Sequence, residues 1–309
     1  MELAIISRNP YLYSTRRLVE AAIQQHHTVR VVDPLRCMVH ISAKMPGLIV
    51  NGARLPSLDA VIPRIGPSVT MYGLALVRQF EMMGVYMLNG SHAIAQSRDK
   101  LGCLQILSSS GIAVPRTVFT NQPEHVREAI ELVGGTPVVL KLMSSSQGMG
   151  VMLADTAQMA RSVLDTFYSL GQSIFIQEYI AEANGQDLRA FVVGERIIAA
   201  IRRVAAAGDF RSNLHRGGTS HDVELPPEYA ETAIRASRTM GLNVAGVDML
   251  ESKVGPMVLE VNSSPGLEGI ETTTGADIAE EIVRFVSEKA QSTREQSVKT
   301  GLMVDPIGA

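Results

Sequence analysis

The stretch that decides the fold is Val244-Ala-Gly-Val-Asp248-Met-Leu-Glu-Ser252, followed after Lys253-Val-Gly by Pro256-Met-Val-Leu-Glu260-Val-Asn262. Two apolar runs flank a Gly-Pro turn, a pattern typical of a β-hairpin. Because side chains alternate along a strand, Val258, Glu260 and Asn262 are expected on one face and the residues between them on the other. A hairpin that pivots near Val254 places Asp248 opposite Glu260.

The hairpin therefore predicts that Asp248, Glu260 and Asn262 converge on one patch of a mostly apolar sheet. Two carboxylates buried side by side are unfavourable unless a cation lies between them. A set of oxygen ligands suits Mg²⁺ or Mn²⁺ rather than zinc. A solvated acidic face of the hairpin is the alternative.

Bulk composition limits the class of protein. The chain has 309 residues, enough for two or three domains, and its 46% hydrophobic and 19% charged residues are typical of a globular protein. A net charge of −3 gives no general attraction to nucleic acids or anionic membranes, so neither partner is expected. No apolar run approaches the ~20 residues of a membrane helix. Two cysteines, Cys37 and Cys103, are too few for a disulfide framework and fit a cytoplasmic location.

The first ninety or so residues predict a parallel α/β unit. Strands are expected at residues 3–7, 28–32 and 58–62, with a helix at 15–25 that Ser14 caps. Arg8 and Arg64 fall just past the C-terminal ends of strands, where open α/β sheets bind ligands. Surface solubility is the alternative for both arginines. The glycine fingerprint of a dinucleotide site does not follow the first strand.

A phosphate site is predicted in the middle of the chain. One long helix is expected over residues 91–110, carrying Lys100, and another over 124–133. A strand at 137–143 has Lys141 in its apolar interior, and a turn of small residues with Gly148 and Gly150 leads to the next strand at 151–154. Backbone N–H groups of such a turn can approach phosphate oxygens, and the lysine supplies a point charge. An ordinary hairpin turn is the alternative.

The following block predicts strands around a tight Gly194-Glu195 turn and then a cationic loop. The strand at 173–180 ends where its backbone could contact a planar base. Five arginines follow with only one nearby acid, and residues 210–218 have no regular periodicity. The arginines are Arg196, Arg202, Arg203, Arg211 and Arg216. Such a cluster suits phosphate and carboxylate ligands, with a solvated charge run as the alternative.

In this order, the features resemble the ATP-grasp superfamily, and within it the RimK family of ligases, which add glutamate to the C-terminus of a small-subunit ribosomal protein. The resemblance covers residues 1–287. The matching strings are Ser7-Arg8, Asp33-Pro34, Pro63-Arg64-Ile65-Gly66, Arg98-Asp99-Lys100, Phe210-Arg-Ser-Asn-Leu-His-Arg-Gly-Gly218, Val244-Ala-Gly-Val-Asp248 and Ser264-Pro-Gly-Leu-Glu-Gly-Ile270.

The resemblance implies an α/β (α+β) fold: a parallel pre-ATP-grasp domain, then a two-lobed ATP-grasp fold that holds the nucleotide between two sheets. The expected divisions are 1–95, 96–182 for the small lobe, 183–287 for the C-terminal lobe, and 288–309 as a flexible tail. A homo-oligomer, a tetramer by analogy, is also implied.

The resemblance also implies roles for individual residues. Asp248, Glu260 and Asn262 would bind two divalent ions, Mg²⁺ or Mn²⁺. The implied ATP-binding residues are Lys100, Lys141, Gly148, Gly150, Glu178, Tyr179, Asp187, Arg211, Ser212 and Asn213. Of these, Glu178-Tyr179 would hold adenine through the backbone, and Asp187 would lie on the ribose side. The implied catalytic residues are Arg202, Arg211 and Asn213.

The implied reaction joins L-glutamate through its α-amino group to a C-terminal carboxylate, by way of an acyl phosphate, and releases ADP and phosphate. The acceptor stays open among a ribosomal-protein tail, another acidic peptide and oligoglutamate. Two rival functions remain. One is a different ATP-grasp ligase, of the D-alanine–D-alanine, glutathione or lysine-carrier type, and the other is a nucleotide-sensing protein without turnover.

Overall fold

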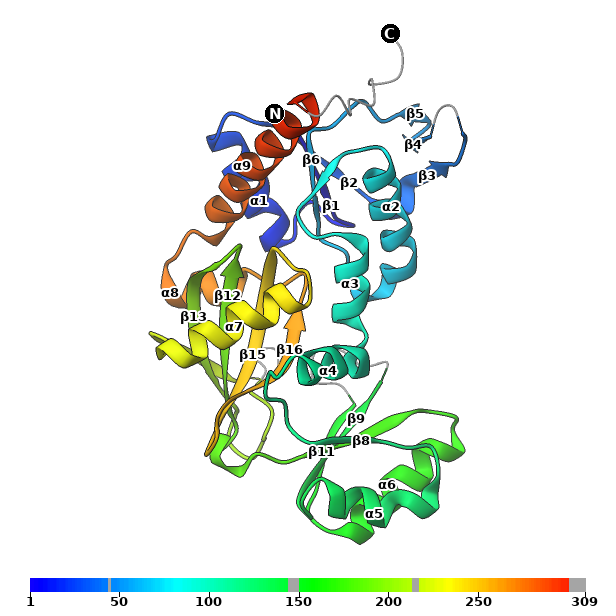
Figure 1. The fold of residues 1–309 in the computed structure, drawn as a ribbon, viewed down its shortest axis with the longest axis vertical. Helices are drawn as coiled ribbons and strands as arrows, with labels where there is room; N and C mark the ends of the chain where they lie inside the picture. The colour runs from blue at the N-terminus through cyan, green and yellow to red at the C-terminus, as the bar shows by residue number, and fades with distance from the viewer. Residues whose placement is uncertain (44–45, 144–149, 213–216, 300–309) are drawn as a thin grey trace.

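A computed structural model describes residues 1–43, 46–143, 150–212 and 217–299. Within these ranges the chain forms a parallel sheet near the N-terminus, a small three-stranded sheet beside it and two larger antiparallel sheets (Figure 1). The predicted Gly148, Asn213 and Arg216 lie outside the described residues.

The parallel sheet has the strand order β2-β1-β6-β7. Its elements are β1 (Glu2–Ile6), α1 (Tyr13–Gln24), β2 (Thr28–Val32), β6 (Ala60–Pro63), α2 (Thr70–Met82) and β7 (Tyr86–Met87). Leu3 and Ile5 pack on the side of α1, whereas Ala4 and Ile6 pack on the side of α2. This burial on both faces explains the continuous apolar run of β1. The predicted parallel α/β unit is confirmed.

The predicted helix cap at Ser14 was wrong. Helix α1 begins at Tyr13, and no side chain caps its first turn. The Ser14 hydroxyl instead accepts a hydrogen bond of 3.0 Å from the backbone N–H of Leu267. The Ser14 hydroxyl, which the local pattern assigned to a helix cap, therefore makes a tertiary contact with a distant part of the chain.

A small antiparallel sheet, which the sequence did not predict, follows β2. A 3₁₀ turn, η1 (Pro34–Arg36), leads into β3 (Cys37–His40), β4 (Gly47–Val50) and β5 (Ala53–Arg54). Leu48 is fully buried against the core on the α2 side. A second 3₁₀ turn, η2 (Pro67–Val69), connects β6 to α2.

The single helix predicted over residues 91–110 was wrong. The structure has α3 (Ser91–Arg98) and α4 (Lys100–Ser109), separated by Asp99 in an extended conformation. The Asp99 carboxylate accepts a 3.0 Å hydrogen bond from the N–H of Gly102, so it caps the second helix. The break places Lys100 at the first position of α4.

The second large element is an antiparallel sheet with the order β10-β9-β11-β8. Its elements are β8 (Thr117–Phe119), η3 (Pro123–His125), α5 (Val126–Leu132), β9 (Val138–Leu142), β10 (Val151–Ala154), α6 (Ala157–Ser169) and β11 (Ile174–Glu178). Helices α5 and α6 cover one face and share its core (Figure 1). The helix predicted at 124–133 is present from Val126 and begins as a 3₁₀ turn.

The third large element is an antiparallel sheet with the order β14-β13-β12-β15-β16. Its elements are η4 (Ala181–Ala183), β12 (Gln186–Val193), β13 (Arg196–Val204), β14 (Thr219–Asp222), α7 (Pro227–Thr239), β15 (Val244–Ser252), β16 (Gly255–Asn262) and α8 (Glu268–Thr274). Helix α7 packs on one face, and α8 contacts β13 and β14. The predicted tight turn at Gly194-Glu195 joins β12 to β13.

The predicted hairpin register is confirmed, since Asp248 pairs with Glu260. The predicted sharing of faces was wrong for Val258. The register shifts between Asp248 and Met249, a β-bulge that leaves Leu259 without a partner. Val258 and Val261 are therefore both fully buried in one core with α7, whereas solvent reaches Glu260 between them.

The predicted flexible tail was wrong for residues 288–299. Helix α9 runs over Ile278–Lys299 and packs beside α1 (Figure 1). Ala290 is buried four residues after Val286, so it extends the apolar stripe of the helix by one more turn. Residues 300–309 lie outside the described residues.

Candidate active site

The third sheet, as we call the five-stranded sheet β14-β13-β12-β15-β16, has one face that is apolar at one end and charged at the other. Toward one end, Phe191, Val193 and Ala199 pack into the core that includes α1 and α9. Toward the other end, the same face carries Asp248 and Glu260 on adjacent strands. The charged half of this face is the place where the sequence predicted a metal site.

Two arginines from neighbouring strands hold Asp248 in place. Arg189 on β12 donates from Nε and Nη2 to the two carboxylate oxygens, at 2.7 Å each. Arg203 on β13 donates from Nη2 to Oδ2 at 2.8 Å. Arg203 also binds the Asp187 carboxylate, with 2.6 Å between Nε and Oδ1. Asp187, Arg203 and Asp248 are all buried.

This network sets the protonation of Asp248. Burial alone would raise the pKa of its carboxyl, but the charges of Arg189 and Arg203, with their hydrogen bonds, lower it to about 2. Asp248 therefore carries a fixed negative charge at neutral pH. Its orientation is set by the bidentate contact with Arg189 and by the contact with Arg203, which Asp248 shares with Asp187.

Glu260 has a different environment. Solvent reaches one side of it, while protein atoms surround the rest. Burial and the nearby charge of Asp248 raise the pKa of Glu260, and the charges of Arg189, Lys100 and Lys141 act in the opposite direction. Within the described ranges no cation lies within ion-pair distance of its carboxylate. An additional cation near Glu260 would favour its ionised form.

The charges of two predicted lysines act on this carboxylate, one from strand β9 and one from helix α4. Lys141 is on β9, and burial lowers its pKa to about 8, against the opposing charge of Glu260. Lys100, at the start of α4, has its pKa lowered by burial, and its Nζ lies 3.4 Å from the carbonyl oxygen of Leu142. The structure thus brings a lysine of the sheet β10-β9-β11-β8 and a lysine of α4 near the acids of the five-stranded sheet.

Asn262 ends β16, where it pairs with Gly246. Its Oδ1 accepts a 3.0 Å hydrogen bond from Ser264 N–H, which shapes the following turn. A Cβ atom on Gly246 would lie 2.8 Å from Cβ of Pro265, so glycine permits this turn to cross β15. The close approach keeps the segment after Asn262 beside the acids.

The cationic loop is described as far as Ser212, which is buried. The Arg211 guanidinium makes two contacts of 2.9 Å with Asp209, and its Nη1 lies 3.3 Å from the Val151 carbonyl on β10. Gly150 precedes that strand with a φ of +69°, and a Cβ there would lie 2.6 Å from the Leu142 side chain. Glycine is thus required where the predicted phosphate turn enters β10.

Glu178 and Tyr179 lie at the end of β11. The Glu178 side chain forms a bidentate pair with Arg116, at 3.0 and 2.8 Å, and its backbone N–H donates to the Arg116 carbonyl at 2.8 Å. The hydrogen bonds from Arg116 lower the pKa of Glu178. The Glu178 side chain is therefore held by Arg116, the residue that directly precedes β8.

The structure does not bring Arg202 to this group. Arg202 lies on the opposite face of the sheet, where it pairs with Glu251 and donates to Gln186 Oε1 at 3.2 Å. Alternation along β13 turns Arg203 toward the acids instead. Sequence reasoning missed Arg189 and Arg203 as site residues. Arg203 was named only as one of the five arginines of the cationic run, whereas Arg189 had a separate signal, because residues two apart such as Asp187 and Arg189 share a face of a strand.

The residues fit a divalent ion through oxygen ligands. In the part of the chain that the structure describes, no three His, Cys, Asp or Glu side chains form a metal cluster. The candidate ligand set is instead two carboxylates and one amide oxygen, from Asp248, Glu260 and Asn262. This donor set suits Mg²⁺ or Mn²⁺.

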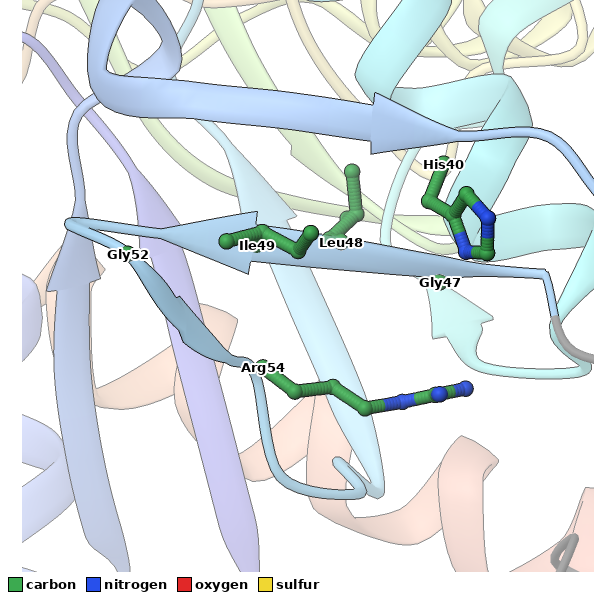
Figure 2. A pocket seen from close by; sticks show the side chains of 6 residues that line it. All are labelled: His40, Gly47, Leu48, Ile49, Gly52 and Arg54. Atoms are coloured by element: carbon green, nitrogen blue, oxygen red, sulfur yellow. The ribbon is translucent and has the colours of Figure 1, made fainter.

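Two hollows lie elsewhere, in the N-terminal part. One, of about 130 Å³, is formed by the small sheet, with His40 and Arg54 flanking Gly47 (Figure 2). The other, of about 270 Å³, lies beside Arg8 and Asp33 at the C-terminal ends of β1 and β2. Neither contains a residue predicted to bind ATP or metal.

An α/β domain followed by two antiparallel sheets, with two lysines near the paired carboxylates, defines an ATP-grasp ligase, an ATP-dependent enzyme whose fold implies a divalent metal ion. Comparison with known families agrees: residues 1–94 match the RimK PreATP-grasp domain and residues 97–286 match the RimK-like ATP-grasp domain. The chain belongs to the RimK-like ATP-grasp family, as the sequence analysis predicted.

Relatives with full-length similarity have a consistent name. A probable alpha-L-glutamate ligase 1 of Shewanella frigidimarina is 54% identical over 97% of this chain and 100% of its own length. A probable alpha-L-glutamate ligase of Ectopseudomonas mendocina is 55% identical over 94% of this chain and 97% of its own.

Solved structures confirm the predicted fold class. The ATP-grasp ligase PsnB, in complex with a phosphomimetic variant of minimal precursor, Mg and ADP, has a TM-score of 0.74 at 21% identity, covering 93% of this chain and 98% of that one. A RimK domain ATP-grasp protein from Sphaerobacter thermophilus has a TM-score of 0.70 at 21% identity, covering 92% of this chain and 99% of that one.

No described helix has the length and apolarity that crossing a membrane requires.

Proposed function

We propose that this protein joins L-glutamate, through its α-amino group, to the C-terminal carboxylate of a glutamate-ended peptide, with ATP converted to ADP and phosphate. The observation that carries the proposal is the pairing of Asp248 with Glu260, where the charges of Lys100 and Lys141 act on Glu260. Acids near lysines from a facing strand and from a helix start suit a metal-bound triphosphate. The names of the full-length relatives support glutamate as the amino acid.

The reaction requires an activated carboxyl group, because a carboxylate is a poor electrophile. Transfer of the terminal phosphoryl group to the acceptor carboxylate gives an acyl phosphate, and attack by the amine then releases phosphate and forms an amide bond. No covalent enzyme intermediate is needed. Catalysis comes from positioning and charge stabilisation.

The chain's own residues divide this work. Lys100 and Lys141 bind phosphate oxygens, and Arg211 neutralises charge on the group in transfer. Arg189 and Arg203 keep the Asp248 carboxylate ionised and oriented. Divalent ions held by Asp248, Glu260 and Asn262 would screen the charge of the triphosphate. We propose two such ions, Mg²⁺ or Mn²⁺.

The remaining assignments are part of the same proposal. Tyr179 and the backbone of Glu178 would hold adenine, and Ser212, Asn213, Gly148 and Gly150 would complete the phosphate site. Asp187 already binds Arg203, so a ribose contact by this carboxylate would be shared with that pair. The divisions at 1–95, 96–182 and 183–287 are the corresponding domains.

The acceptor is the finest part of the proposal. A small-subunit ribosomal protein with a glutamate-ended tail is the candidate that the family resemblance supports, and oligoglutamate is the alternative. The PsnB structures contain precursor peptides, so a peptide acceptor is compatible with this fold. The homo-oligomer and the cytoplasmic location stay predictions.

The test is incubation of the protein with ATP, Mg²⁺ and each amino acid in turn, followed by ADP measurement and mass spectrometry of products. Glutamate-dependent ADP release with a mass increase of one glutamate on an acidic peptide is expected. Release with D-alanine or a glutathione precursor instead would favour a different ATP-grasp ligase. Tight ATP binding without ADP release under any condition would favour a nucleotide-sensing protein and refute the proposal.

A further inference from the structure

Three arginines gather around the segment that follows β6. Arg8 Nη1 lies 3.4 Å from Ser68 Oγ, and Arg98 donates to Thr70 Oγ1 at 2.5 Å and to the carbonyls of Ile65 and Gly66. Arg64 begins this segment, at the C-terminal end of a parallel strand. None of the three has a carboxylate within ion-pair distance among residues 1–43, 46–143, 150–212 and 217–299. Most other described arginines do pair with an acid.

Arg64 is the least compensated of these cations. Burial lowers its pKa to about 10, and no acid acts against this effect. Its Nη1 donates to the Pro265 carbonyl at 2.7 Å. The Nε and Nη2 groups have no acceptor within the described chain, yet neither is sealed from solvent. A guanidinium surrounded by protein with an open pair of donors is suited to an anionic ligand.

The open pair of donors is the one that this protein uses for carboxylates elsewhere. Arg189 binds Asp248 through Nε and Nη2, and Arg203 binds Asp187 through the same edge. The fork geometry of this edge matches the two oxygens of a carboxylate. Arg64 therefore offers a carboxylate site of the kind that is filled twice within the third sheet.

The position of Arg64 connects it to the reacting centre. Pro265, which accepts its hydrogen bond, is three residues beyond Asn262 and crosses β15 at Gly246. Gly246 and Asp248 are on the same face of β15, about 7 Å apart along the strand. Ser264 Oγ also lies 3.4 Å from the Pro63 carbonyl, so two contacts fix the arginine to this turn.

We propose that Arg64 binds a carboxylate of the incoming amino acid through its Nε–Nη2 edge, while Arg98 positions the segment that carries it. The inference rests on the proposed function and identifies the residue that selects an acidic amino acid. Arg98 is a positioning residue, because its donors already bind carbonyls and a hydroxyl of residues 65–70.

The test is a steady-state comparison of unaltered protein, Arg64→Gln and Arg64→Lys with L-glutamate, L-glutamine and glutamate α-amide. Loss of a charged hydrogen-bond pair is expected to raise the KM for glutamate about 10- to 150-fold in Arg64→Gln, with a smaller rise in Arg64→Lys. The KM for ATP should not change. In Arg64→Gln the preference for glutamate over one of the two amides should disappear, and that amide identifies the carboxylate bound.

Arg78→Gln is the matched control, because Arg78 is exposed on α2 and also has no acid partner in the described part of the protein. An unchanged glutamate KM in Arg64→Gln overturns the inference. So does an equal rise for glutamate and both amides, which indicates a structural effect, or a rise confined to the KM of the acceptor peptide. Absence of glutamate-dependent ADP release from unaltered protein overturns the proposed function and the inference together.

Discussion

Asp248 and Glu260 face each other across the β15–β16 pair, and among the described residues arginines hydrogen-bond directly to Asp248 but not to Glu260. Two guanidinium groups bind Asp248, whereas the nearby charges of Arg189, of Lys100 on α4 and of Lys141 on β9 act on Glu260. One acid thus has a fixed charge and orientation, and the other has a charge that responds to what binds between the sheets. The two acids should therefore differ when each is neutralised.

Glu260→Gln is expected to reduce turnover at least about 100-fold, because one charge-stabilising group is lost from the reacting centre. Its melting temperature without metal should not fall, since the raised pKa of Glu260 means that ionisation at neutral pH opposes folding. ADP release and thermal melting measure the two effects. Glu251→Gln, in the same hairpin but on the opposite face, is the control and should retain turnover. Equal losses in both variants would contradict the assignment.

Asp248→Asn is expected to lower the free energy of unfolding by about 3–5 kcal/mol, because it leaves half-buried Arg189 without a carboxylate partner and leaves buried Arg203 with Asp187 alone. The lowered pKa of Asp248, about 2 against an ordinary 3.8, means that its contribution is present above pH 4 and is lost as pH falls through about 2. Urea unfolding from pH 7 to pH 2 should show this loss in the unaltered protein. The variant should lack that part of the slope, and a parallel pH profile would refute the role of the pair.

Lys141 predicts a pH dependence of ATP binding. With a pKa of about 8, the lysine loses its charge as pH rises through 8, so the affinity for ATP should fall there. A bound triphosphate favours the protonated lysine, so binding near pH 8 should take up protons. Calorimetry in buffers of different ionisation enthalpy measures this uptake. Lys141→Arg keeps its charge at these pH values and should lose the dependence. Proton uptake that persists in this variant would assign it to another group.

Gly246→Ala is expected to lower stability by about 1–3 kcal/mol, because the new methyl group would lie 2.8 Å from Cβ of Pro265. The displaced turn carries the Arg64 contact, so the KM for glutamate should rise as well. Gly66→Ala is the matched control, since no atom lies within 4 Å of a Cβ there and its φ is −75°. Chemical denaturation and steady-state kinetics distinguish the two variants, and similar values for both would argue against the close approach.

Arg211→Ala is expected to lower turnover by about 10²–10³, since it removes a cation from the loop beside β10. Single-turnover measurement of ADP formation separates this effect from ATP binding. Arg196→Ala, an exposed residue paired with Glu281 at the far end of β13, is the control. Near-normal ADP formation in Arg211→Ala would remove this residue from the proposed site.

Local patterns were sufficient for several parts of the fold. Apolar runs predicted β1 and β2, and the Gly-Pro turn predicted the register that pairs Asp248 with Glu260. These predictions hold because strand alternation and turn geometry depend on near neighbours. The prediction of one helix over 91–110 was wrong at Asp99, where one helix ends and the Asp99 side chain caps the start of the next. The prediction of a flexible tail was wrong for the end of α9, because the last apolar turn of this helix packs in the core with α1, more than 250 residues away in the chain.

By itself, the sequence determined which residue types were available for the chemistry: two acids and an amide on one hairpin, a lysine within a strand, and a run of arginines. It could not decide which arginine serves which acid. The five-stranded sheet made that choice, because its register turns Arg189 and Arg203 toward Asp248 and turns Arg202 away to Glu251. Likewise, Arg64 is an ordinary strand-end residue until the turn after Asn262 packs on Gly246 and brings Pro265 to it. Contacts between strands distant in the chain set these pairings, and only the folded structure contains them.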